Sequence, residues 1–349
     1  MMPRQALTRR AAHRLVLTLA LALAGGGALA RNTAPAAPAA AELDLAGTRL
    51  GFATQAQTQA LIQKDDAWLQ AASPFQRAAT MGLAGKGSQQ KAPGLARFKS
   101  FLASTALEWP AGEKARWQKA AQEFAPRLAQ LQMAHQPKSI QLALTDGRDA
   151  ANTPYTRGST IYLPRNYASR SSSDVELLAH EYFHILTREN PELAQSIYQL
   201  LGFSTTNELE WPAEWLPARI ANPDAPHSKN VMALQRDGKT IHVMPLLVAH
   251  RTELQPGETF FHVLDVRLLS VTPGTGQQPS RALRGPDGQL QWTEVSEARD
   301  YLQRLGGNTK YVFHPEETAA DNFAYLVSGR KVRNPELLTQ LAQRLRAGR

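Results

Sequence analysis

The residues best suited to catalysis lie in the segment His180-Glu181-Tyr182-Phe183-His184, an HExxH arrangement. Histidines four residues apart share one face of an α-helix, so both imidazole rings can bind the same ion. Zn²⁺ accepts such nitrogen ligands and lowers the pKa of a bound water molecule towards about 7. Glu181 is placed to take a proton from that water as it attacks a carbonyl group. The motif therefore predicts a zinc hydrolase with His180 and His184 as ligands and Glu181 as general base.

The HExxH segment must be helical for this chemistry, and its flanking residues predict a helix over Ser173–Arg188. Ser173 and Glu176 have the spacing of a capping box, and apolar residues recur at helical intervals after them. Since most of this helix is apolar, the two histidines are expected to be enclosed by protein. Burial of two imidazoles and a carboxylate without partners is costly, which favours a metal site over ordinary packing.

A catalytic zinc site needs a third protein ligand, and the sequence offers several carboxylates. The residues Ile185–Asn190 contain no third histidine at the metzincin spacing. Four glutamates remain as candidates: Glu208, Glu210, Glu316 and Glu317.

Glu317 is the preferred candidate because Asp321 follows it by one helical turn. A proline opens the predicted helix Pro315–Ser328, and both carboxylates lie on one face of it. Glu317 can then bind the metal while Asp321 accepts the second ring N–H of a ligand histidine. A preference of acidic residues for helix N-termini explains Glu316 and Glu317, but it does not explain Asp321. Glu208 and Glu316 stay open as alternatives.

These residues resemble the pattern of the gluzincin zinc metallopeptidases, in which a glutamate ligand and an aspartate four residues later follow HExxH. The matching residues are His180, Glu181, His184, Glu317 and Asp321. The segments DVELLAHEYFHILTREN and YVFHPEETAADNFAYLV are also similar to paired motifs of bacterial secreted proteins of this type. The resemblance rests on these two short segments and implies a zincin-like fold. The separation between them is longer than in thermolysin-like members, which implies a large insertion.

Further roles follow from position in the sequence and from the resemblance. Peptide hydrolysis develops negative charge on the carbonyl oxygen, so a hydrogen-bond donor is expected near the metal. Tyr311 and His314, just before the Glu317 helix, are the nearest candidates, and Tyr155 is another. The resemblance also implies a strand beside the active helix that binds an extended substrate, and Ser159–Leu163 is expected in that role.

The arrangement of helical and strand patterns predicts an α+β fold. Residues 43–136 are expected to form a mostly helical N-terminal region, which begins with a helix over Thr54–Gln70. Residues 137–349 are expected to form a zincin-like domain with a small mixed sheet and the active-site helix. A β-rich insertion at about 231–295 and two C-terminal helices complete it.

The N-terminal sequence predicts export. Residues 1–30 combine four arginines, an apolar run and a small-residue cleavage site, as in a signal peptide, and residues 31–42 form an Ala/Pro linker expected to be disordered. Loss of residues 1–30 removes four of the 39 basic residues and none of the 30 acidic ones, which leaves a net charge of +5. This mild charge, without a dense basic block, does not support nucleic-acid binding. The chain has no cysteine, so thiolate ligands and disulfides are excluded.

The sequence thus predicts a periplasmic or secreted zinc metallopeptidase that acts on peptide or protein substrates. One zinc ion per chain and no stable membrane anchor after signal cleavage are expected. Two other interpretations remain open. The first is a zinc-binding envelope scaffold without turnover, and the second is a metalloamidase acting on peptidoglycan cross-links.

Overall fold

The computed structural model describes four stretches of the chain, residues 42–85, 93–169, 172–236 and 238–348. The predicted signal peptide and the predicted linker up to residue 41 lie outside them. The fold is α+β, as predicted, with helices and mixed sheets. All described residues belong to one compact unit. None of the helices in these four stretches combines the length and apolar character needed to cross a bilayer.

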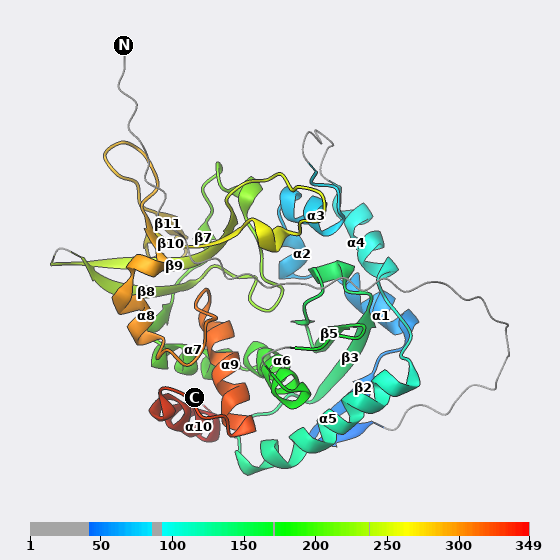
Figure 1. Ribbon diagram of the computed structural model, residues 1–349. Helices are drawn as coiled ribbons and strands as arrows, with labels where there is room; N and C mark the ends of the chain where they lie inside the picture. Colours follow the sequence, from blue (N-terminus) through cyan, green and yellow to red (C-terminus); the bar gives the residue numbers. More distant parts are fainter. Residues whose placement is uncertain (1–41, 86–92, 170–171, 237, 349) are drawn as a thin grey trace. The chain divides into compact units, whose positions relative to one another are not determined.

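A five-stranded mixed sheet lies on one side of the HExxH helix (Figure 1). Its strands, in spatial order, are β1 (Leu43–Leu45), β2 (Thr48–Phe52), β3 (Ser139–Thr145), β5 (Thr160–Pro164) and β4 (Tyr155–Arg157). β2, β3 and β5 run parallel, whereas β1 and β4 are antiparallel to their neighbours. The predicted substrate strand corresponds to β5, which is internal to the sheet because β3 and β4 pair with its two sides. β4 is the edge strand on this side of the sheet, and β1 is the opposite edge.

The N-terminal region holds the helices α1 (Gln55–Ile62), α2 (Ala67–Ala71), α3 (Pro74–Thr80), α4 (Leu95–Ser104) and α5 (Ala111–Gln130). The prediction of one helix over Thr54–Gln70 is wrong, because the helix is interrupted between α1 and α2. Asp66 is extended there, and its carboxylate accepts a hydrogen bond from the Leu69 N–H at 2.9 Å, which starts a new helix. The region also contains β1 and β2, which join the sheet of the following segment.

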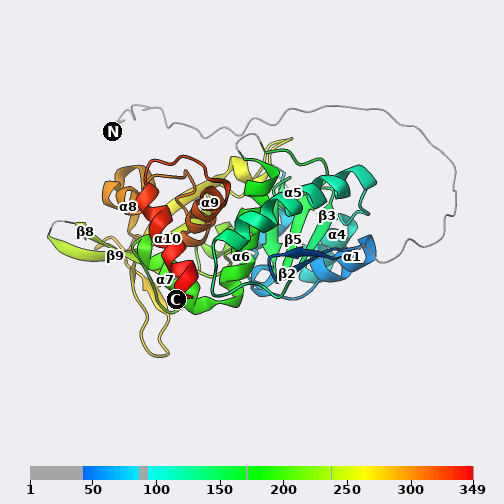
Figure 2. The same cartoon turned by 90° about the horizontal axis from the view of Figure 1, so that it is seen from below.

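Two helices, α6 (Asp174–Glu189) and α9 (Pro315–Ser328), lie side by side between the two sheets (Figures 1 and 2). Their contact is aromatic: the Phe323 ring of α9 lies 6.1 Å from Tyr182 and 5.3 Å from Phe183 of α6. Phe124 of α5 meets Tyr182 edge-on at 5.4 Å. Burial of each such ring contributes about 1.5–3 kcal/mol, so the pair of helices is firmly held. Two further helices pack against α9, α7 (Pro191–Leu200) and α10 (Pro335–Ala347).

The predicted β-rich insertion is a sheet of seven strands. Six of them follow the spatial order β6 (Phe203–Thr205), β8 (Asn230–Arg236), β9 (Lys239–Ala249), β10 (Leu264–Thr272), β11 (Ser280–Ala282) and β7 (Leu209–Glu210). The seventh, β12 (Trp292–Glu294), pairs with β10. The sheet therefore starts well before residue 231, and helix α8 (Arg299–Arg304) leads from it back to α9. Between β7 and β8, residues 211–229 form an irregular connection with one short 3₁₀ turn, Leu216–Ala218.

Candidate metal centre

Helix α6 presents both histidines of the HExxH segment. The predicted capping box is present, with the Glu176 N–H donating to Ser173 Oγ at 3.2 Å and the Ser173 N–H donating to Glu176 Oε2 at 3.3 Å. His180 and His184 follow on one face of the helix, and their ring centroids are 4.7 Å apart. His184 is only 1% exposed, so its ring lies inside the protein, as expected from the apolar helix.

Helix α9 brings Glu317 to these two rings. Its Oε2 atom lies 3.3 Å from His180 Nε2 and 3.9 Å from His184 Nε2. Ligand atoms of a tetrahedral zinc ion, each about 2.0–2.2 Å from the metal, lie about 3.3–3.6 Å from one another. The two distances from Glu317 to the histidine nitrogens are therefore close to those of a zinc site, and ligand atoms of all three residues lie within 4.8 Å of one another.

Each histidine ring is oriented by its own carboxylate. The Nδ1–H of His180 donates to Asp321 Oδ1 at 3.0 Å, and the Nδ1–H of His184 donates to Glu316 Oε1 at 2.7 Å. These bonds assign the proton of each neutral ring to Nδ1 and leave both Nε2 atoms as ligands. Asp321 thus lies where the sequence analysis placed it. Glu316, the alternative third ligand, instead binds Nδ1 of His184, the ring nitrogen on the side away from the ligand atom Nε2.

The two orienting carboxylates are themselves held by hydroxyl groups. Thr187 Oγ1 donates to Glu316 Oε1 at 2.7 Å, and the Tyr198 hydroxyl donates to Glu316 Oε2. Thr309 Oγ1 donates to Asp321 Oδ2, which also accepts from the Tyr325 hydroxyl at 3.3 Å. Because both oxygens of each carboxylate are engaged, the orientation of each histidine ring is fixed by a network rather than by a single bond.

Two buried atoms at the centre of this arrangement have no hydrogen-bond partner among the described residues: His184 Nε2 and Glu181 Oε2. Glu181 is 3% exposed. A buried nitrogen acceptor and a buried carboxylate oxygen left without partners cost about 1–3 kcal/mol each, more for a charged group. A cation held by the histidines, together with a water molecule beside Glu181, would satisfy both. The donor set, two imidazole nitrogens and one carboxylate, is also typical of catalytic zinc.

Burial and the protein's own charges shift the pKa values of the site residues strongly. Burial would raise the pKa of Glu317, but His184 and His180 outweigh it and lower the pKa to about 2. Burial first, and then the charge of Asp224, raise the pKa of Glu181 to about 8. Burial would lower the pKa of His184, but Asp224 and Glu317 raise it to about 9. A metal ion must displace the proton of His184, so metal binding is expected to weaken as the pH falls.

Two residues of the irregular 211–229 connection reach the site and were missed by the sequence analysis. Asn222 Nδ2 donates to Glu317 Oε1 at 2.5 Å, which leaves Oε2 of that carboxylate towards the histidines. Asp224 offers a ligand atom within 4.8 Å of ligand atoms of both Glu181 and His184. Neither residue stands in a periodic pattern, so no sequence signal could have identified it.

The candidate transition-state donors fall in different places. Tyr311 lies beside the metal centre: its ring centroid is 6.2 Å from that of His180, and 48% of the residue is exposed. His314 caps α9 instead, because its Nδ1 accepts the Glu316 N–H at 3.1 Å. Its Nε2 faces Asn230 at 3.4 Å, and burial lowers its pKa to about 4. His314 thus serves as the N-cap of α9, with its Nδ1 taken by the Glu316 N–H.

The remaining candidates lie outside the centre. The Tyr155 hydroxyl donates to the buried Asp149 at 2.8 Å, under the five-stranded sheet. Glu208 accepts hydrogen bonds from His227 and from the Ser228 N–H on the protein surface. Glu210 pairs with Arg281 at 3.0 Å. The structure therefore brings Glu317 to the histidines, and it does not bring Glu208 or Glu210 there.

One stretch of the chain is similar to a known family. A family model described as the eCIS core domain matches residues 116–192. This stretch runs from α5 to the start of α7 and contains the whole HExxH segment, but it ends before Glu317. It covers less than half of the chain, so the similarity applies to that stretch. No curated protein and no solved structure matches the chain.

The orienting role of Asp321 predicts a measurable loss of zinc affinity in Asp321→Asn. Asparagine keeps the shape of the side chain but removes the charge that favours a basic, correctly turned His180 ring. Replacement of such orienting residues typically weakens metal binding about 10–100-fold, and we expect a loss in this range. Competition with a chromophoric chelator measures it. The matched control is Asp300→Asn. Asp300 lies on α8, and its carboxylate pairs with Arg236 at the end of β8. Equal affinities in the two variants would contradict the role of Asp321.

Proposed function

We propose that this chain is an exported zinc-dependent metallopeptidase that hydrolyses peptide bonds with Glu181 as general base. One observation carries the proposal: His180 Nε2, His184 Nε2 and Glu317 Oε2 converge, and the unpartnered Glu181 Oε2 is buried beside them. A structural metal site requires no such carboxylate. A hydrolase requires a base that can reach the attacking water.

The chain's own residues divide the work of hydrolysis. His180, His184 and Glu317 would hold the ion, which when bound supplies Lewis-acid polarisation of water and of the scissile carbonyl. Glu181 accepts the proton of the attacking water and returns it to the departing amine. Its low exposure keeps bulk water away from this transfer. Tyr311, exposed at the rim and next to His180, is the side chain best placed to donate a hydrogen bond to the carbonyl oxygen.

The location and the substrate class follow from independent features. The eCIS core domain belongs to a family of extracellular contractile injection system proteins that includes metallopeptidase-like members. Its match supports a function outside the cytoplasm, as does the signal-peptide pattern of residues 1–30. We propose peptides or proteins as substrates, because the edge strand β4 beside α6 suits an extended chain.

A quenched fluorescent peptide library tests the proposal. The zinc-loaded chain is expected to cleave members of the library, to stop after removal of zinc with 1,10-phenanthroline, and to recover when zinc is returned. Cleavage sites identified by mass spectrometry should be peptide bonds. Cleavage that persists after complete removal of zinc would contradict a metal-dependent mechanism. A zinc-loaded chain that cleaves nothing would favour the scaffold interpretation.

A further inference from the structure

The connection between the strands β7 and β8 passes directly over the metal centre. Asn222 donates to Oε1 of the ligand Glu317 at 2.5 Å, and two residues later Asp224 approaches Glu181 and His184. Glu181 and His184, which each have a buried atom without a partner among the described residues, form a group with Asp224 that is separate from the group of His180, His184 and Glu317. Asp224 is therefore a third carboxylate at a site that already has a metal-binding glutamate and a general base.

Asp224 is also fastened to the edge strand β4. Its Oδ1 accepts the Thr156 N–H at 2.6 Å and the Thr156 hydroxyl at 2.9 Å. Both bonds end on the same carboxylate oxygen. A strand at the edge of a sheet binds an extended peptide through its outward N–H and C=O groups. The Asp224 side chain takes the N–H of Thr156 that such a peptide would use.

The connection is fastened on both sides. Arg188, in the last turn of α6, donates to the carbonyl of Asp224 at 3.2 Å and to Thr156 Oγ1 at 2.9 Å. On the other side, the Ile220 N–H donates to the carbonyl of Leu247 in β9 at 3.0 Å. These bonds tie the segment to the helix that bears the histidines and to the inserted sheet.

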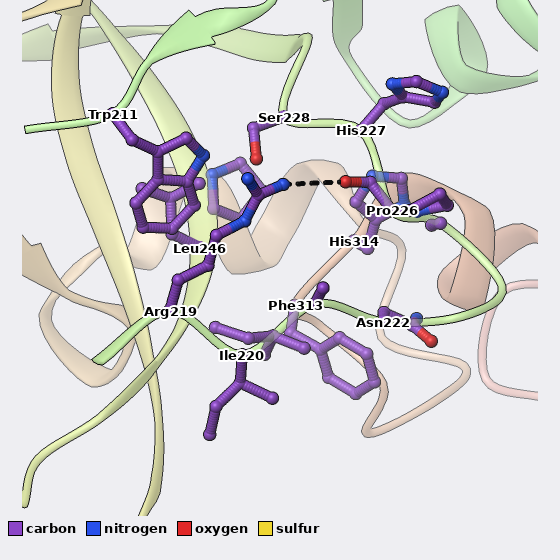
Figure 3. A pocket seen from close by; sticks show the side chains of 14 residues that line it. Trp211, Arg219, Ile220, Asn222, Pro226, His227, Ser228, Leu246, Phe313 and His314 are labelled. Carbon is purple, nitrogen blue, oxygen red and sulfur yellow. Dashed lines mark hydrogen bonds between the residues drawn. The ribbon is translucent and has the colours of Figure 1, made fainter. Parts of the chain in front are cut away.

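The chain after Asp224 also forms one wall of a pocket between the inserted sheet and the start of α9 (Figure 3). In this pocket Arg219 donates to the carbonyl of Pro226 at 3.0 Å, and its guanidinium lies 4.8 Å from the centre of the Trp211 ring. The connection on both sides of Asp224 is therefore held in place by contacts of Ile220 and Arg219.

We propose that, in a resting state, the segment Asn222–Asp224 blocks the substrate site of the proposed peptidase, with Asp224 occupying the N–H of Thr156. A substrate can pair with β4 and reach Glu181 only after Asp224 has left Thr156. The segment is thus an intramolecular inhibitor, and displacement of the 211–229 connection activates the enzyme. This inference rests on the proposed function for its activity but not for the contact between Asp224 and Thr156.

Two Asp224 variants separate the charge of this side chain from its contact with Thr156. Asp224→Ala removes both, whereas Asp224→Asn loses the charge but keeps an oxygen that can accept from Thr156. Asp287→Ala is the matched control, because Asp287 also accepts a backbone N–H in a turn of the insertion, that of Gln289. All chains are prepared with zinc and, separately, with cobalt(II).

Three measurements test the inference. Asp224→Ala should cleave the peptide library about tenfold faster than wild type or more, because β4 is no longer covered. The visible spectrum of the cobalt(II) form should stay that of wild type in both Asp224 variants, because the three converging ligand atoms belong to other residues. Hydrogen exchange at the Thr156 amide should accelerate in Asp224→Ala and stay slow in Asp224→Asn. The Asp287→Ala chain should match wild type in all three.

The outcomes distinguish this inference from the proposed function. Slower cleavage by Asp224→Ala would make Asp224 part of the catalytic machinery and overturn the inhibitory role. A cobalt spectrum that changes in both Asp224 variants would make Asp224 a metal ligand and overturn a role confined to β4. If no chain cleaves any peptide, the proposed peptidase fails. The Thr156 exchange would still decide whether Asp224 covers β4.

Discussion

Glu181→Gln is expected to lose nearly all peptide hydrolysis while it keeps its zinc. Glutamine has the size and shape of glutamate, so the packing of α6 around this 3% exposed side chain should persist. It cannot accept the proton of the attacking water, and general-base catalysis contributes about 10²–10⁴-fold. We therefore expect a fall of that size in kcat/KM. The three converging ligand atoms belong to other residues, so zinc per chain should equal that of wild type.

The matched control for this variant is Glu189→Gln, at the exposed end of the same helix. It makes the same chemical change outside the site and should cleave at the wild-type rate. A Glu181→Gln chain that is as active as Glu189→Gln would remove the general base from the mechanism. Loss of zinc together with activity in Glu181→Gln would show instead that Glu181 is needed to hold the metal.

Glu317→Ala is expected to have the second large effect, on zinc affinity. Its Oε2 lies 3.3 Å and 3.9 Å from the two ligand nitrogens. Its loss leaves His180 and His184, both on α6, as the remaining ligands of this group. Replacement of an orienting residue weakens metal binding about 10–100-fold, so loss of a direct ligand should weaken it more than 100-fold. Competition with a chelator measures the change. Glu208→Ala, the rejected alternative on the protein surface, should bind zinc as wild type does.

The active helix could be predicted from the sequence because its signals are local. The capping box of Ser173 and Glu176 lies within one turn, and the helical spacing of His180 and His184 fixes their common face. The same reasoning placed Asp321 one turn after Glu317. The structure adds the contact between α6 and α9 that brings the two pairs together.

Glu316 shows where helix phase alone is insufficient. It is adjacent to Glu317, so it points about 100° away around the helix. From the sequence alone, this direction indicates only that Glu316 is less well placed than Glu317 to bind the metal. In the fold, that side of α9 faces the far nitrogen of His184, and Glu316 becomes the residue that orients the ring. Asn222 and Asp224 were beyond prediction for a stronger reason, since an irregular connection has no periodicity from which a contact can be inferred.

The N-terminal region was predicted less well because short elements carry weak patterns. β1 and β2 are three and five residues long and flank a turn at Gly47. Their alternation of apolar and polar residues is therefore too short to predict a strand. The break between α1 and α2 depends on Asp66, whose capping role competes with continuation of the helix. The helix prediction followed the apolar pattern across this residue and missed the cap.

The most direct test of the account is the zinc content of the chain, measured by mass spectrometry after purification with zinc supplied. We predict about one zinc ion per chain in wild type and in Glu181→Gln, and strong loss in His184→Ala and Glu317→Ala. Zinc retained in Glu317→Ala would move the third ligand to another residue. A wild-type chain that binds no zinc under these conditions would contradict the metal centre and every step proposed for it.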